Sequence, residues 1–438
     1  MSISPRRAAE IVDALRRGTV PRASLDAFCV GLDRFEAAVD ADLEAVASGR
    51  GVFKAVRGDY GCGKTFFTRW LADRARKRGF VTSEVQISET ETPLHKLETV
   101  YRRLMERLAT ADTPEGALRT IVDGWFHVLE EDVLAEGASP DDAQALVTRT
   151  TALLEQRLAG VTAHAPLFAA AIRGYRQASA AGDRATADGV LAWAAGQPHV
   201  AASVKKTAGI KGDLDHFGAL GFLQGVLTML RDAGHAGLLV VLDEVETIQR
   251  VRSDARDKSL NALRQLIDEV EGGRFPGLFL VITGTPSFFD GPQGVRRLEP
   301  LAQRLHVDFQ TDARFDNPRA VQLRLPPFDL DRLCRVGAKI RDIFQGVSVA
   351  PERIASVCDD AYVRRLAEAV AGQLGGKVGI APRIFLKKLV SDVLDRIDQF
   401  PDFDPTRDYR LTVNETEMTP VERQASGATD LDAIDLDL

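Results

Sequence analysis

The residues of this chain best suited to chemistry form a phosphate-binding pattern near the N-terminus. Eight consecutive residues match the P-loop spacing G-x-x-x-x-G-K-[ST] at every required position: Gly58, Asp59, Tyr60, Gly61, Cys62, Gly63, Lys64 and Thr65. Glycines let the backbone turn tightly enough for its N–H groups to face phosphates, and the helix expected from Phe66 adds its positive end. We expect Lys64 to reach the β- and γ-phosphates and Thr65 to ligate Mg²⁺. The pattern therefore predicts an ATP and Mg²⁺ site.

A second motif, which is acidic, favours ATP hydrolysis over ATP binding alone. The apolar run 237–242 is typical of a strand buried on both faces of a parallel sheet, and it ends in Asp243 and Glu244. This is a Walker B signature, in which Asp243 holds the Mg²⁺ shell and Glu244 orients and deprotonates the attacking water. Glu246, two residues later, is expected to be solvated or to start a helix.

Further polar residues follow a third apolar run. The strand predicted over 277–285 carries Thr283 and Thr285, which either sense the γ-phosphate or bond the turn. Beyond it, three arginines are candidates to reach the phosphate of a neighbouring subunit, although each is also typical of a solvated surface: Arg296, Arg297 and Arg304.

The elements that must position these residues alternate between strands and helices. Strands are predicted over 52–56 and 80–87, and helices over 66–78, 220–231 and 259–270. The fold class is therefore α/β, with a parallel sheet. The 179 positions between the P-loop lysine and the Walker B aspartate exceed one crossover helix, which predicts an all-helical insertion. The predicted organisation is N-terminal helices and the first half of the core in 1–93, the insertion in 94–217, the second half of the core in 218–325, a helical lid in 326–411 and an acidic disordered tail in 412–438.

Composition limits the other classes of protein. A chain of 438 residues with 45% hydrophobic and 27% charged residues is ordinary for a globular protein, and it lacks an apolar run of eighteen residues. We expect a cytoplasmic protein without a membrane partner. The four cysteines have no C-x-x-C spacing, which argues against a zinc site or a disulfide framework. Of these, Cys62 is either oxidation-sensitive or simply a small residue that the loop tolerates.

The order of these motifs resembles the AAA+ ATPases, and segments around them resemble the BREX system ATP-binding proteins, which are BrxD-like proteins of bacterial phage-defence islands. The segments that carry the resemblance are 15–21, 57–67, 242–246 and 284–289. The resemblance implies that Arg383, which directly follows Pro382 in the lid, is a second sensor that contacts the γ-phosphate. It also implies antiviral defence with a helicase-like or methyltransferase partner. The first sensor of the family is often Asn, where this chain has Thr283.

Two functional hypotheses remain open. One is an oligomeric motor or switch that binds ATP and ADP, with a homo-oligomer such as a hexamer-like ring and with DNA as a candidate ligand. The other is a slow-turnover signalling or scaffold ATPase whose ATP state controls a partner complex. A small-molecule kinase makes poor use of a lid arginine and a long insertion, and neither a transporter signature nor a second motor core is present in the sequence.

Overall fold

The computed structural model describes residues 3–375, 379, 381–419 and 422–423. The chain divides into two compact units that interleave along the sequence. Unit 1 comprises Met1–Ala38, Val56–Asp73 and Asp308–Leu438, whereas unit 2 comprises Val39–Ala55 and Arg74–Val307.

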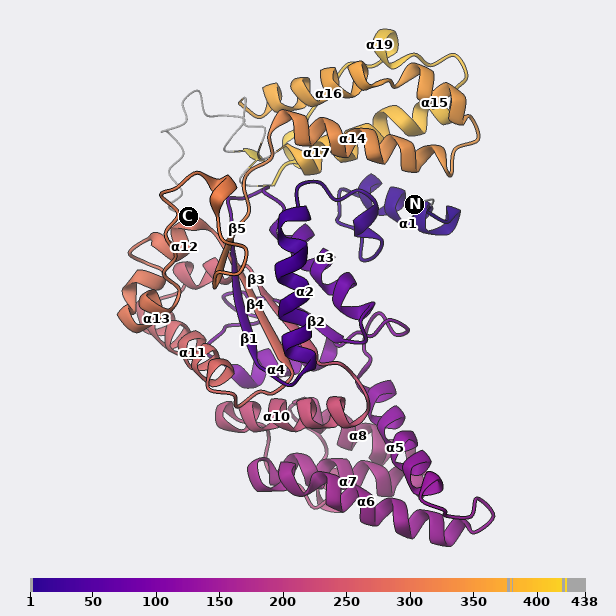
Figure 1. Ribbon diagram of the computed structural model, residues 1–438, viewed down its shortest axis with the longest axis vertical. Helices are drawn as coiled ribbons and strands as arrows, with labels where there is room; N and C mark the ends of the chain where they lie inside the picture. Colours follow the sequence, from indigo (N-terminus) through magenta and orange to yellow (C-terminus); the bar gives the residue numbers. More distant parts are fainter. Residues whose placement is uncertain (1–2, 376–378, 380, 420–421, 424–438) are drawn as a thin grey trace. The chain divides into compact units, whose positions relative to one another are not determined.

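A five-stranded parallel sheet, in the order β2-β3-β4-β1-β5, confirms the predicted α/β class (Figure 1). Its strands are β1 (Val52–Arg57), β2 (Val81–Gln86), β3 (Leu238–Asp243), β4 (Leu278–Gly284) and β5 (Gln322–Arg324). Strands β3 and β4 are buried along their whole length, as their continuous apolar sequences predict. The first four strands were predicted from the sequence. The fifth, β5, was not, because three residues are too few for a periodic signal.

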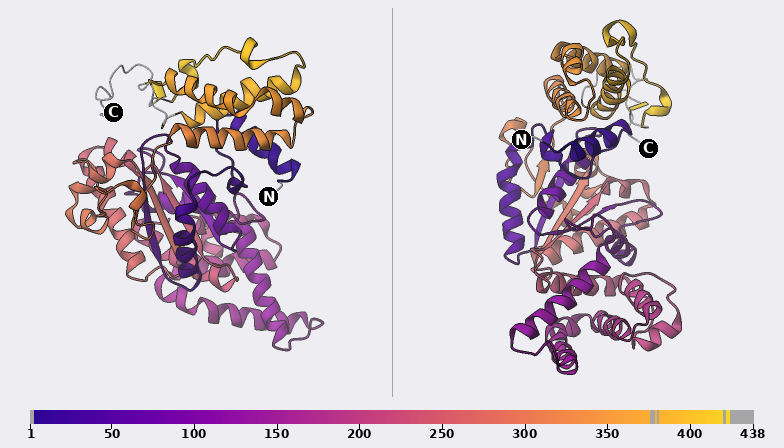
Figure 2. Two further views of the ribbon diagram at one scale, coloured as in Figure 1. Left: turned by 45° about the horizontal axis from the view of Figure 1, so that its top comes forward. Right: turned by 90° about the vertical axis from the view of Figure 1, so that its right-hand side faces the viewer.

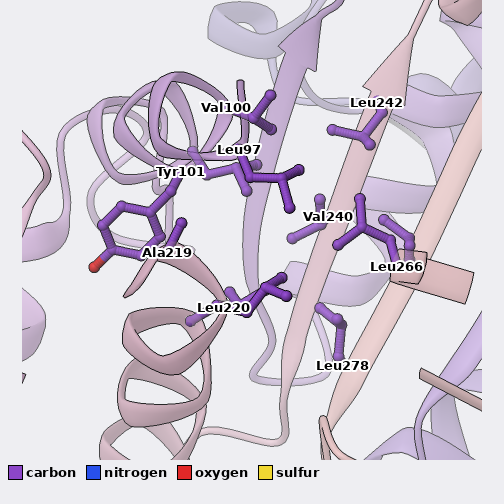
Figure 3. A pocket seen from close by; sticks show the side chains of 12 residues that line it. Leu97, Val100, Tyr101, Ala219, Leu220, Val240, Leu242, Leu266 and Leu278 are labelled. Atoms are coloured by element: carbon purple, nitrogen blue, oxygen red, sulfur yellow. The ribbon is translucent and has the colours of Figure 1, made fainter. Parts of the chain in front are cut away.

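Three helices of unit 2 cover one face of β3 and β4. They are α4 (Leu97–Glu106), α10 (His216–Asp232) and α11 (Ser253–Glu271). Together with the sheet they line an apolar cavity of about 30 Å³, where Leu97 of α4 lies between Tyr101 and Val240 of β3 (Figure 3). Ligand pockets have volumes of about 300–1,000 Å³, so this cavity is a packing gap and not a nucleotide site.

Residues 94–217 of unit 2 continue as a helical layer (Figure 2). After α4 it contains α5 (Leu118–Ala135), α6 (Ala143–His164), α7 (Pro166–Ala180), α8 (Arg184–Ala194) and α9 (Ala202–Thr207). The aromatic rings of Phe168 and Trp193 pack edge-on against Phe222 of α10. Asp142 and Asp183 each accept a hydrogen bond from a backbone N–H three residues later, which caps α6 and α8.

The remaining helices of unit 2 follow β3 and β4. They are η2 (Val245–Arg250), α12 (Pro286–Asp290), η3 (Val295–Arg297) and α13 (Glu299–Arg304). Helix α2 (Asp33–Ala47) begins in unit 1 and ends in unit 2.

Unit 1 gathers the helices of both chain ends. These are α1 (Pro5–Arg16), η1 (Leu25–Ala27), α3 (Lys64–Arg76, whose last three residues fall in unit 2), η4 (Ala313–Phe315), α14 (Leu330–Gln345), α15 (Pro351–Val357), α16 (Asp360–Gln373), α17 (Pro382–Lys388), the π-helical segment η6 (Leu389–Leu394), α18 (Asp395–Gln399), α19 (Pro405–Asp408) and η7 (Glu415–Glu417). Helix α1 packs against α14 and α17. Arg16 Nε and Nη2 donate to the two carboxylate oxygens of Asp395, at 2.7 and 2.8 Å. This fork-shaped pair fixes α1 to α18.

Among the residues that the structure describes, no helix combines the length and the apolar composition needed to cross a membrane.

Candidate functional site

The glycine-rich loop joins the end of β1 to the start of α3, in the predicted strand–loop–helix order. Gly61 and Gly63 have φ angles of 80° and 97°, in the left-handed region that favours glycine. A Cβ added at Gly58 would lie 2.3 Å from Cys62 Sγ, so the loop has no room for a side chain there. Two of these glycines are therefore required by backbone conformation and the third by space.

Lys64, the first residue of α3, folds back over this loop. Its Nζ donates to the carbonyl oxygens of Gly58 at 2.8 Å and Asp59 at 3.2 Å, and it lies 5.1 Å from the centre of the Tyr60 ring. The residue is only 8% exposed. A buried ammonium group beside the positive N-terminal end of a helix gives a positively charged cradle, which fits a polyphosphate. Thr65 and Phe66 occupy this first turn of α3.

The thiol of Cys62 points into the protein. The residue is 6% exposed, and burial raises the pKa of its thiol to about 11, against a smaller lowering effect of Lys64. A thiol of this kind is protonated at neutral pH and a weak nucleophile. Of the two interpretations of Cys62 from the sequence, its burial favours a small residue that the loop tolerates.

A turn near the N-terminus holds α3 from outside the loop. Arg69 donates to the carbonyl oxygen of Val20, and Trp70 Nε1 donates to Asp26 Oδ1 at 2.9 Å. The ring of Phe66 packs edge-on against that of Phe28, with centroids 5.3 Å apart. Residues 20–28 therefore fix the helix whose first turn carries the cradle.

The two Walker B carboxylates lie at the carboxyl end of β3 in unit 2. Asp243 is 7% exposed, and Thr283 of β4 is completely buried beside it. The Thr283 hydroxyl donates to Asp243 Oδ1 and accepts from the Glu244 N–H at 3.1 Å. The Glu244 N–H also donates to Asp243 Oδ1 at 3.2 Å. Thr283 therefore ties the two acidic residues together.

Glu244 itself has an unusual backbone. Its φ and ψ are 58° and 44°, a left-handed conformation that non-glycine residues rarely adopt. Its carboxylate accepts a hydrogen bond from Gln86 Nε2, at the end of β2, at 2.7 Å. Gln86 was missed in the sequence, where it could have been found as a polar residue at the end of the strand that neighbours β3.

Glu246 and Thr285 lie outside the hydrogen-bonded cluster of Asp243, Glu244 and Thr283. Glu246, expected to be solvated or to start a helix, is 4% exposed within η2, so the solvated alternative is wrong. The hydroxyl of Thr285 lies 3.0 Å from that of Ser287 at the start of α12, which is a turn contact.

The three candidate arginines differ in their partners. Arg297 donates to Asp257 and, at 2.7 Å, to Ser253. Arg304 Nε lies 2.5 Å from Asp268 Oδ1. Arg296 is exposed, and its side chain has no hydrogen bond or ion pair within the described part of the chain. Arg296 is therefore the one of the three that is not engaged by any residue in the described part of the chain.

Arg383, the predicted second sensor, lies in the first turn of α17 and is already engaged. Its guanidinium donates to the carboxylate of Glu422 and to the carbonyl oxygen of Glu417. Both partners belong to the segment 412–438 that was expected to be disordered. Its described part contacts α17, while residues 420–421 and 424–438 lie outside the described residues.

The protein groups present suit Mg²⁺ better than a metal with a full set of protein ligands. Across the described ranges, no group of three or more His, Cys, Asp and Glu side chains is placed to hold a metal ion. Mg²⁺ usually keeps several waters and takes only one or two protein ligands besides substrate phosphates. Thr65 and Asp243 are a hydroxyl and a carboxylate of the required kind.

A parallel α/β sheet that leads through a glycine-rich loop into a helix, with an acidic pair at the end of another strand, is the architecture of the P-loop nucleotide-binding proteins. Residues 3–413 match the family model of the BREX system ATP-binding protein BrxC/D, and the chain belongs to this family. It is thus an ATP-binding protein of a phage-defence system, and the resemblance found in its sequence is confirmed. Neither the curated proteins nor the solved structures gave a match.

Proposed function

We propose that this chain is an AAA+ ATPase that binds ATP with Mg²⁺ and hydrolyses it. In this proposal it acts as an oligomeric motor or switch in the cytoplasm, on DNA or on a DNA-processing partner such as a helicase-like protein or a methyltransferase. The observation that carries the proposal is the hydrogen-bonded cluster of Asp243, Glu244 and Thr283, at the ends of two strands of the sheet whose β1 leads into the P-loop.

The proposed roles follow from the chemistry of each group. The carboxyl ends of parallel strands share one edge of a sheet, which is where α/β proteins bind ligands. When bound, ATP with Mg²⁺ supplies an activated phosphoryl group. Lys64 and the first-turn N–H groups of α3 hold the phosphates, while Thr65 and Asp243 hold the metal. Glu244 orients the water and accepts its proton, and Thr283 keeps both carboxylates in place.

The AAA+ part of the proposal rests on the lid and on an available arginine. Arg383 presents its guanidinium from the lid helix α17, as the second sensor of that superfamily does. Arg296 lies after β4 with no partner among the described residues, so it is available to a neighbouring subunit. An arginine that stabilises transition-state charge in this way acts only in an oligomer.

One pair of contacts favours a slow switch over a fast motor. The carboxylate of Glu244 is bonded to Gln86, and the guanidinium of Arg383 is bonded to Glu422. Both groups that would act on the γ-phosphate thus have partners within their own chain, and the need to break these contacts would keep basal turnover low.

Two variants test the proposal directly. Lys64→Ala should lose nucleotide binding, because it removes the cation of the cradle. Glu244→Gln should bind ATP but hydrolyse it roughly 10²–10⁴-fold more slowly, because it removes the base. Equilibrium binding and phosphate release should be measured with and without DNA, and the mass of Glu244→Gln with and without ATP and Mg²⁺. Glu271→Gln, exposed at the end of α11, is the charge-matched control. Wild-type turnover in Glu244→Gln would refute the Walker B assignment.

A further inference from the structure

Two nitrogens on one edge of the Arg383 guanidinium bind a carboxylate of the same chain. Nε donates to Glu422 Oε1 at 3.0 Å, and Nη2 donates to Glu422 Oε2. Nη2 also donates to the backbone carbonyl of Glu417. Glu422 is only 3% exposed although it belongs to the acidic segment 412–438. Two parallel charge-assisted bonds on a buried carboxylate make a strong and directional contact.

The same segment neutralises the next two cations of the lid helix. Glu417 accepts hydrogen bonds from Lys387 at 3.0 Å and from Lys388 at 2.8 Å. Burial alone would raise the pKa of Glu417, but the hydrogen bonds from Lys388 and Lys387 outweigh it and lower that pKa to about 2. Glu417 is therefore ionised at neutral pH, and three consecutive cations of the lid have carboxylate partners.

The remaining nitrogen of the Arg383 guanidinium, Nη1, lies beside the turn at Gly18, and the Arg383 side chain is 34% exposed. A Cβ added at Gly18, which has a φ of +70°, would lie 3.4 Å from Arg383 Nη1. Glu422 takes the edge formed by Nε and Nη2. Phosphate oxygens and carboxylate oxygens use the same fork of N–H donors, so the two anions compete for one edge.

We propose that Glu417 and Glu422 form an internal latch, in which Glu422 occupies the phosphate-binding edge of Arg383 and must leave before that arginine contacts the terminal phosphate of ATP. The latch rests on the proposed function, since it concerns the lid arginine of the same nucleotide site. ATP and the latch are then coupled in both directions. Release of the latch tightens ATP binding, and ATP binding displaces the latch.

Affinity measurements on full-length variants test the first direction. Glu422→Gln keeps the shape of the side chain and removes its charge. It should bind ATP about five-fold or more tightly than the wild type, the lower end of typical coupling between two sites. Its affinity for ADP should change less than about two-fold, because ADP lacks the terminal phosphate. Glu352→Gln, exposed on α15, has the same charge change and should bind both nucleotides as the wild type does.

A double-mutant cycle separates the latch from other effects of charge. In an Arg383→Ala background, Glu422→Gln should change ATP affinity less than two-fold, because the group that it competes for is absent. An unchanged ATP affinity in the single variant, or an equal gain in both backgrounds, would overturn the latch. The Lys64→Ala variant distinguishes failure of the proposed nucleotide site from failure of the latch. If it binds ATP normally, the proposed nucleotide site is wrong, whereas loss of binding together with an inert Glu422→Gln refutes the latch alone.

Hydrogen–deuterium exchange on the wild-type chain tests the second direction and needs no variant. Saturating ATP with Mg²⁺ should speed amide exchange in peptides that cover 415–423, and ADP should leave their exchange near the nucleotide-free rate. Equal exchange in the ATP-bound and nucleotide-free states would contradict the latch even if every variant folded poorly.

Discussion

Replacement of Thr283 by valine is the sharpest test of how the acidic pair is held. Valine has nearly the same shape, so the change leaves no large cavity, but it removes the hydroxyl that donates to Asp243 and accepts from Glu244. A hydrogen bond to a charged group contributes about 1.5–3 kcal/mol to stability. Since Thr283 is completely buried, water does not replace the lost donor. We therefore expect the free energy of unfolding to fall by about 1.5–3 kcal/mol.

The same change should slow hydrolysis more than it weakens binding. If the lost interaction is expressed fully in the transition state, 1.5–3 kcal/mol corresponds to a decrease in kcat of roughly 10–150-fold. The hydroxyl bonds to the acidic pair and belongs to neither the P-loop nor α3, so the dissociation constant for ATP should change less than about three-fold.

Urea denaturation, nucleotide binding and steady-state phosphate release measure these three quantities. Thr283→Ser is the matched control, because it keeps the hydroxyl and loses one methyl group, which costs about 1 kcal/mol of stability. The serine variant should keep turnover within about three-fold of the wild type. A valine variant with wild-type turnover and wild-type stability would show that Thr283 does not position the carboxylates.

Two further predictions concern the P-loop thiol and the arginine in trans. Because burial raises the pKa of Cys62 to about 11, alkylation of this thiol by iodoacetamide at pH 8 should be roughly 100-fold slower than that of an exposed cysteine of pKa 9. Peptide mass spectrometry measures the rate of alkylation. A rate equal to that of an unfolded control would contradict the burial argument. Arg296→Ala should keep ATP affinity and lose roughly 10³-fold in hydrolysis, with recovery on mixing with Lys64→Ala. Arg297→Ala and Arg304→Ala should hydrolyse ATP normally, because each side chain is already engaged within its own chain. Normal hydrolysis in all three variants refutes the shared site.

The sequence predicts best those elements whose signal is local. The strands β3 and β4 follow from continuous apolar runs, and the strand–loop–helix around Lys64 follows from the P-loop spacing. The start of α11 was placed late, at 259 in place of Ser253, because its first turns are polar and carry no apolar period. Boundaries of this kind depend on capping and tertiary packing more than on composition.

The parts that the sequence did not predict depend on long-range partners. Gln86 meets Glu244 from 158 positions away, and Glu422 meets Arg383 from 39 positions away. An acidic segment that is poor in aromatic residues predicts disorder, since it buries little apolar surface. That rule counts hydrophobic burial alone, whereas Glu417 and Glu422 are held by cations of the lid helix.

The left-handed backbone at Glu244 has a consequence for how members of such a family diverge. A side chain other than glycine costs about 1–2 kcal/mol in this conformation, and asparagine tolerates it better than most residues. Selection for stability alone would therefore replace this glutamate. Under the proposed function, the need for its carboxylate opposes that replacement. Position 244 thus acts as a record of past selection: lineages that still hydrolyse ATP should retain glutamate, while lineages that merely bind it should accumulate glycine or asparagine at the same turn.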